Sequence, residues 1–152
     1  MPERDTSPSA GWLDGREHVL PVRIYYEDTD FTGVVYHANY LRYFERGRSD
    51  FFRLVGISHS DFLALAEPTA FSVIRIELDF KRAARIDDAL LVRTTYDSVT
   101  GARLNVSQRI VRGEELVARA AVQAVCIDLK GRARRPPREM LEALSPLFGP
   151  AP

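Results

Sequence analysis

Three acidic residues stand within four positions, directly before a segment with the features of a helix. They are Glu27, Asp28 and Asp30, and Gly33 provides a turn before the helix. A carboxylate can attack an electrophile or accept a proton from water. The N–H groups in the first turn of a helix lack partners within the helix and can stabilise a developing negative oxygen. The stretch 25–48 therefore contains the chemical parts of a reaction site.

The elements on either side of the acids must position them. The segment Val19–Glu27 is rich in β-branched and aromatic residues and predicts a strand that leads to the acids. A helix is predicted over 39–55, because apolar residues recur at three- and four-residue spacing and Gly56 is a suitable stop. Gly47 lies on this apolar stripe, where a glycine costs about 1 kcal/mol relative to alanine. It is therefore expected to let the helix pack closely against a sheet.

The rest of the chain is predicted to be mostly strands. Alternating apolar and polar residues predict strands at 71–82, 90–98, 102–112 and 116–129, with short helices at 58–66 and 138–144. Strands joined by tight turns are antiparallel. One long apolar helix then packs on one five-stranded, mostly antiparallel sheet, which is an α+β architecture. The last strand is apolar on both sides, which favours an oligomer.

Composition limits the class of protein. The chain has 152 residues, 45% of them hydrophobic and 28% charged, with a formal net charge of +0. One domain at 18–145 is expected, between a flexible tail at 1–17 and a second tail at 146–152. The balanced charge argues against a nucleic-acid partner. No segment has the length of an integral membrane span and the start lacks a secretory signal, so a cytoplasmic protein is expected. The single cysteine, Cys126, excludes an internal disulfide.

The residues around the helix start match a known pattern. They are Tyr26–Asp30, Gly33–His37, Asn39–Leu41 and Phe44–Arg46. This pattern resembles the hotdog-fold acyl-CoA thioesterases, and within them the 4-hydroxybenzoyl-CoA thioesterase-like branch that includes the bacterial Tol–Pal-associated acyl-CoA thioesterases. The resemblance implies hydrolysis of acyl-CoA to free acid and CoA without a metal or cofactor. It also implies a homodimer with a continuous sheet, commonly paired into a homotetramer, with the active site at the subunit interface.

The resemblance assigns roles to individual residues. It makes Asp30 the catalytic carboxylate, either as the nucleophile or as a general base. It makes His37 the residue whose backbone N–H faces the thioester carbonyl, while its imidazole is either a further acid or substrate contact or has no role. Arg132 and Arg134 become candidates for binding the phosphates of CoA. Three scattered histidines do not suggest a metal site.

Three neighbouring residues have structural roles as well as possible roles in the site. Tyr36 is expected to form a wall of the acyl pocket or to pack in an interface. Asn39 is expected to cap the helix, with a contact to substrate also open. Asp28 is expected to support the loop as a hydrogen-bond acceptor. Outside this motif, an aspartate such as Asp30 before a helix is usually a cap or a turn residue.

Two other functions stay open. A hotdog-fold dehydratase or isomerase would place a histidine and an acid of the partner subunit around the helix. A carboxylate ahead of the helix fits hydrolysis better. An acyl-thioester-binding or scaffold protein would bind CoA without turnover, and a thiol-release assay separates these functions.

Overall fold

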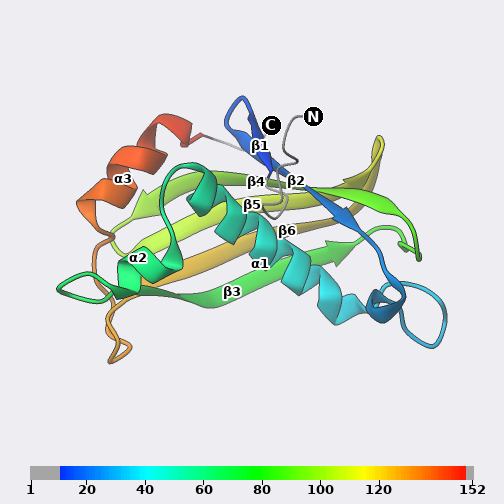
Figure 1. Ribbon diagram of the computed structural model, residues 1–152, viewed down its shortest axis with the longest axis horizontal. Helices are drawn as coiled ribbons and strands as arrows, with labels where there is room; N and C mark the ends of the chain where they lie inside the picture. Colours follow the sequence, from blue (N-terminus) through cyan, green and yellow to red (C-terminus); the bar gives the residue numbers. More distant parts are fainter. Residues whose placement is uncertain (1–10, 150–152) are drawn as a thin grey trace, which may run out of the picture.

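A single sheet with one long helix across its face forms the body of the molecule (Figure 1). The computed structural model describes residues 11–149. The sheet order is β1-β2-β4-β5-β6-β3, and every neighbouring pair is antiparallel. The strands are β1 (Trp12–Asp14), β2 (Glu17–Arg23), β3 (Ala70–Phe80), β4 (Ala89–Thr100), β5 (Arg103–Arg112) and β6 (Glu115–Ile127). The helices are α1 (His37–Leu54), α2 (His59–Leu63) and α3 (Arg138–Leu144), with two 3-10 turns, η1 (Tyr26–Asp28) and η2 (Ser145–Leu147).

The α+β class and the sheet packed around one helix are confirmed, but the sheet has six strands and not five. The additional strand is β1, in which Trp12 lies opposite Val19 of β2. The part of the expected N-terminal tail that the structure describes therefore belongs to the sheet. Residues 1–10 and 150–152 lie outside the described residues, and the domain boundaries at 18 and 145 stay predictions.

The first predicted strand is wrong at its C-terminal end. β2 ends at Arg23, and the chain then forms the 3-10 turn η1. The carboxylate of Asp28 accepts a hydrogen bond from the backbone N–H of Tyr25 at 2.7 Å, which closes this turn. An aspartate that bonds its own local backbone competes with strand pairing. The three acids therefore lie in a turn and a loop, and none of them stands at the end of a strand.

Gly47 has the role that its place on the apolar stripe predicts. A Cβ atom added to it would lie 2.8 Å from Thr94 Oγ1 and 2.9 Å from Val92 Cγ1, both on β4. The nearby Gln108 side chain donates to the Phe44 carbonyl at 2.8 Å, which joins α1 to the sheet by a buried hydrogen bond. This close approach fixes the position of α1 over the sheet.

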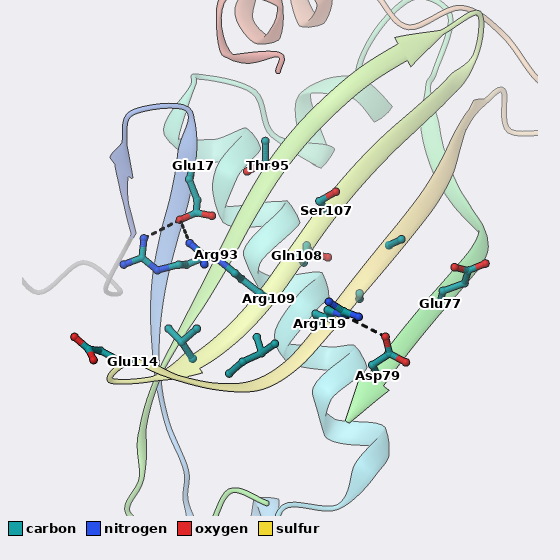
Figure 2. A pocket seen from close by; sticks show the side chains of 14 residues that line it. Glu17, Glu77, Asp79, Arg93, Thr95, Ser107, Gln108, Arg109, Glu114 and Arg119 are labelled. Carbon is teal, nitrogen blue, oxygen red and sulfur yellow. Dashed lines mark hydrogen bonds and ion pairs between the residues drawn. The ribbon is translucent and has the colours of Figure 1, made fainter. Parts of the chain in front are cut away.

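The face of the sheet opposite α1 is charged, and the prediction of a fully apolar last strand is wrong (Figure 2). The Glu17 carboxylate bonds Arg93 at 2.8 Å and Arg109 at 3.0 Å. Arg119 of β6 pairs with Asp79 of β3 at 3.2 Å. These arginines are paired with carboxylates of neighbouring strands, so this face of the sheet is a network of ion pairs.

Among residues 11–149, none of the helices combines the length and the apolar composition of a membrane span. No group of three or more His, Cys, Asp or Glu side chains in the same residues is placed to hold a metal ion.

Candidate active site

Asp30 is held in a tight loop between η1 and α1. Its Oδ1 accepts hydrogen bonds from the backbone N–H of Thr32 at 2.8 Å and from the Thr32 hydroxyl at 2.7 Å. The Asp30 N–H donates to the Val34 carbonyl at 2.8 Å, and Gly33, with a φ of 82°, closes the turn. Both hydrogen bonds from Thr32 are therefore made to Oδ1. The loop thus fixes one oxygen of the carboxylate and leaves the other available.

The same hydrogen bonds set the charge of Asp30. The hydroxyl and backbone N–H of Thr32 hold the pKa of the Asp30 carboxyl below its ordinary value, with a small further contribution from the charge of His37. The residue is half-buried in a single chain. Hydrogen bonds to the charged form of a carboxyl favour that form. Asp30 is therefore a carboxylate at neutral pH.

The start of α1 lies directly after this loop. Tyr36 is the N-cap residue and has no side-chain cap. Its own N–H donates to the Asp28 carbonyl at 3.0 Å. The helix begins at His37, whose N–H lies in the first turn and has no partner within the helix. His37 therefore presents a backbone donor at the positive end of an 18-residue helix.

Asn39 does not cap the helix, so that prediction is wrong. It lies inside α1, and its side-chain amide donates to the Asp28 carbonyl at 2.9 Å. Asp28 also closes η1 through its carboxylate, which confirms its supporting role. Asn39 and Asp28 together connect the Asp30 loop to the helix.

Aromatic rings surround the helix start. The His37 ring lies 4.6 Å from the Tyr36 ring and 6.4 Å from the ring of Phe80, at the end of β3. Tyr36 is 47% exposed, Phe80 52%, and Phe31 fully exposed. A cluster of exposed aromatic side chains is typical of a surface that another molecule covers. In a single chain Tyr36 does not form the wall of an enclosed pocket.

Arg132 and Arg134 lie at the other end of β3. Arg134 pairs at 2.7 Å with Glu67, which precedes β3, and Arg132 pairs with Asp128 at 3.0 Å. Phe80, beside His37, ends the same strand of 11 residues. At about 3.3 Å per residue the strand is roughly 35 Å long. One chain therefore does not bring these arginines to Asp30.

A small cavity between α1 and the sheet also lies near the start of β3. It has a volume of about 120 Å³, and Phe52, Phe71 and Tyr96 are among its lining residues. Glu45, Ser49 and His59 line it as well and are joined by hydrogen bonds. No motif in the sequence groups these three residues, and His59 is an exposed residue at the start of α2. The i, i+4 spacing of Glu45 and Ser49 is the one signal in the sequence that places two of them on one helix face.

Comparison with known proteins agrees with this geometry. A model of the thioesterase-like superfamily matches residues 24–144. An acyl-CoA thioesterase YbgC of Haemophilus influenzae is 41% identical over 110 residues, 72% of this chain and 80% of that protein. An acyl-CoA thioester hydrolase YbgC of Escherichia coli is 41% identical over 123 residues, 80% of this chain and 90% of that protein.

A solved structure shares both fold and sequence. A probable thioesterase from Bartonella henselae superposes with a TM-score of 0.77 at 40% identity, over 80% of this chain and 99% of that one. The segment matched by the family model, residues 24–144, includes both Asp30 and His37. The chain belongs to the thioesterase-like superfamily and has its hotdog fold.

Proposed function

We propose that this protein is an acyl-CoA thioesterase, which hydrolyses the thioester of acyl-CoA to a free acid and CoA. The observation that carries the proposal is the ionised Asp30 carboxylate, held by Thr32 in the loop that leads into the start of α1. The relatives named as acyl-CoA thioesterases support the same reaction. A location in the cytoplasm is part of this proposal.

Asp30 acts as the nucleophile in this mechanism. A general base works best when its pKa lies near the working pH, whereas the pKa of Asp30 is lowered. An Asp30 oxygen attacks the thioester carbon, and the carbonyl oxygen becomes an oxyanion that accepts a hydrogen bond from the His37 N–H. Loss of one such donor costs about 3–4 kcal/mol of barrier in known oxyanion holes. The C–S bond then breaks, CoA leaves as the thiolate, and the acyl group stays on Asp30 as a mixed anhydride.

A homodimer brings the separate parts of the site together. β3 is an edge strand of 11 residues, and Val73 and Ile74 on it are 45% and 50% exposed. A long edge with exposed apolar side chains is a template for pairing with another strand. Antiparallel pairing of two β3 strands places the start of each beside the end of the other. Arg132 and Arg134 of one copy then lie near Asp30 of the other, where they bind the phosphates of CoA.

Two such dimers form the homotetramer that the resemblance implies. The charged face of the sheet carries both signs, with Glu17 and Asp79 beside arginines (Figure 2). A surface with both signs of charge can be complementary to a second copy of itself across a two-fold axis.

The test is the variant Asp30→Asn assayed by release of free thiol from a panel of acyl-CoAs. Because the amide cannot attack, we expect turnover to fall at least about 10³-fold. Asp61→Asn, an exposed aspartate in α2, is the matched control and keeps its activity. Unchanged turnover by Asp30→Asn contradicts the mechanism. Saturable CoA binding by the unmodified protein, with no thiol released from any substrate, would indicate a binding protein instead.

A further inference from the structure

Glu45, Ser49 and His59 form a hydrogen-bonded group, here called the Glu45–Ser49–His59 array. The Ser49 hydroxyl donates to Glu45 Oε1 at 2.5 Å, and His59 Nε2 lies 3.0 Å from the same hydroxyl oxygen. A hydroxyl has one hydrogen and a carboxylate only accepts, so His59 Nε2 supplies the hydrogen of the second bond. The neutral imidazole then has a free lone pair on Nδ1. The array therefore offers acceptors on both the carboxylate and the ring.

The surroundings of the array hold it in place. The His59 ring lies 5.9 Å from the Phe52 ring and 6.0 Å from the Phe71 ring, both nearly edge-on. Arg48 lies next to the array, with its guanidinium donating to Gln108 Oε1 at 2.9 Å. Together these groups border the cavity of about 120 Å³. Proton acceptors beside an apolar cavity are suited to binding a water molecule next to an acyl group.

The array lies at the opposite end of β3 from Asp30. Phe71, which touches His59, is the second residue of the strand, whereas Phe80, which touches His37, is the last. In Figure 1, α2 lies beside the start of β3, and the loop before α1 lies at the far end of the helix. Glu45 follows His37 by eight residues on α1, which is about 12 Å along the helix axis. Within one chain a water bound at Glu45 is therefore separated from a bond at Asp30 by more than the length of a hydrogen bond. Antiparallel pairing of two β3 strands about their middle brings Phe71 of one copy close to Phe80 of the other.

The proposed nucleophile creates a need for a second group. Once Asp30 carries the acyl group it is no longer a carboxylate and cannot accept a proton from water. A separate acceptor must then activate the water that releases the acid. Among the lining residues of the apolar cavity, Glu45 is the only carboxylate.

We propose, on the basis of the function proposed above, that the Glu45–Ser49–His59 array of one copy completes the active site of the other. There it binds the water that hydrolyses the acyl–Asp30 anhydride. The water gives one proton to the Glu45 carboxylate, and its oxygen forms the new bond to the acyl carbon. The bond between that carbon and the Asp30 oxygen breaks, which releases the free acid and restores the Asp30 carboxylate. Glu45 then returns its proton to solvent.

Subunit mixing tests whether the two groups come from different copies. Asp30→Asn and Glu45→Gln chains are each expected to be nearly inactive alone. In a random mixture of equal amounts, a site is intact only when its Asp30 comes from a Glu45→Gln chain and its Glu45 comes from an Asp30→Asn chain. About one quarter of the sites meet this condition, so the mixture regains about a quarter of wild-type activity. If both residues acted from one copy, no intact site would form, and absence of recovery overturns the inference.

The kinetics of thiol release test the role of the array. Glu45→Gln still attacks the thioester through Asp30, so it shows a burst of one thiol per site followed by a rate reduced roughly 10²-fold. Its mass after rapid quenching includes the acyl group. Asp30→Asn shows neither the burst nor the added mass. A Glu45→Gln variant with wild-type turnover, or with a slow rate and no burst, contradicts the role in hydrolysis.

Two further variants separate this role from a merely structural one. Ser49→Thr keeps a hydroxyl and is expected to keep most activity, whereas Ser49→Ala shows the slow, burst-type kinetics of Glu45→Gln. Glu142→Gln, an exposed glutamate of α3, is the control for loss of a helical carboxylate and retains full turnover. Equal activity of Ser49→Ala and Ser49→Thr overturns the inference. An active Asp30→Asn variant would contradict the proposed role of Asp30 as the nucleophile, which is a different result from loss of the proposed role of the array.

Discussion

The two ends of β3 differ in what they offer to a substrate. Near Phe80 lie the reactive Asp30 carboxylate and the free N–H of His37, surrounded by exposed aromatic rings. Near the start of β3 lie an apolar cavity and two arginines, Arg132 and Arg134. In residues 11–149 the first end holds the proposed nucleophile and the start of α1. The second end holds the apolar cavity, the two arginines and the start of the short helix α2.

This difference suits the proposed dimer, in which each end of β3 supplies part of one site. The edge strand is roughly 35 Å long, so Arg132 and Arg134 lie far from His37 within one chain. In the proposed dimer, a two-fold axis through the middle of β3 places the start of each strand beside the end of its partner. The exposed apolar positions of β3 then serve the proposed site as well as the sheet.

Among the variants that test this comparison, the largest effect is expected when pairing between two β3 strands is lost. Ile74→Lys places a charge on the exposed edge of β3, where charged side chains prevent strand pairing. Because Ile74 is half exposed, the monomer stays folded, while the dimer dissociates and turnover falls more than about 10²-fold. Light scattering and thiol release measure the two effects. Leu13→Lys, on the other edge of the sheet, is the control and leaves both unchanged. An active dimer of Ile74→Lys would disprove assembly through β3.

A smaller effect is expected from the cations at the start of β3. Arg134→Ala removes one charge from the CoA phosphates and is expected to raise KM about tenfold at constant kcat, which corresponds to about 1.4 kcal/mol of binding. An acyl-pantetheine substrate lacks the nucleotide phosphates, so its KM stays the same. Arg138→Ala, an exposed arginine paired with Glu142, is the control. An equal rise in KM for both substrates would contradict phosphate binding.

Much of the fold could be predicted because its signals are local. The strand β5 ends at Arg112 and the helix α3 spans Arg138–Leu144, as the sequence predicts. Gly47 was identifiable because only close packing explains a glycine on an apolar helix face. The sequence pattern around Asp30 and His37 is likewise contiguous. Each of these features depends on residues that are close together in the sequence.

The errors concern contacts that depend on side chains meeting in space. Asp28 forms η1 through a hydrogen bond to Tyr25, although the segment has the composition of a strand. Asn39 bonds the Asp28 carbonyl across the loop instead of capping α1. His59 meets Ser49 only because α2 folds back along α1. Composition and periodicity carry no information about these three contacts.

Gly47 lies on α1 between Glu45 and Ser49, where the helix packs closely against β4. Its substitution is expected to disturb this packing slightly. In Gly47→Ala the new Cβ presses on Thr94 and Val92, which costs about 1–3 kcal/mol, while the better helix propensity returns about 1 kcal/mol. The expected result is a net loss of up to about 2 kcal/mol in the free energy of unfolding. Urea denaturation measures it, with Arg42→Ala on the exposed helix face as the control. A stabilised variant would show that α1 can move away from the sheet freely.

The smallest expected effect is a shift in the pH profile at the Asp30 end alone. The Thr32 hydroxyl donates one of the hydrogen bonds that lower the pKa of Asp30, so Thr32→Ala raises that pKa toward its ordinary value. A lowered pKa keeps the carboxylate ionised as the pH falls, and a raised one loses it at higher pH. The acid limb of kcat/KM therefore moves to higher pH, whereas activity at neutral pH changes less than about twofold. Thr29→Ala removes a hydroxyl that bonds the Tyr26 carbonyl and leaves the limb in place. An unmoved limb in Thr32→Ala would mean that the carboxylate which titrates in catalysis is not Asp30.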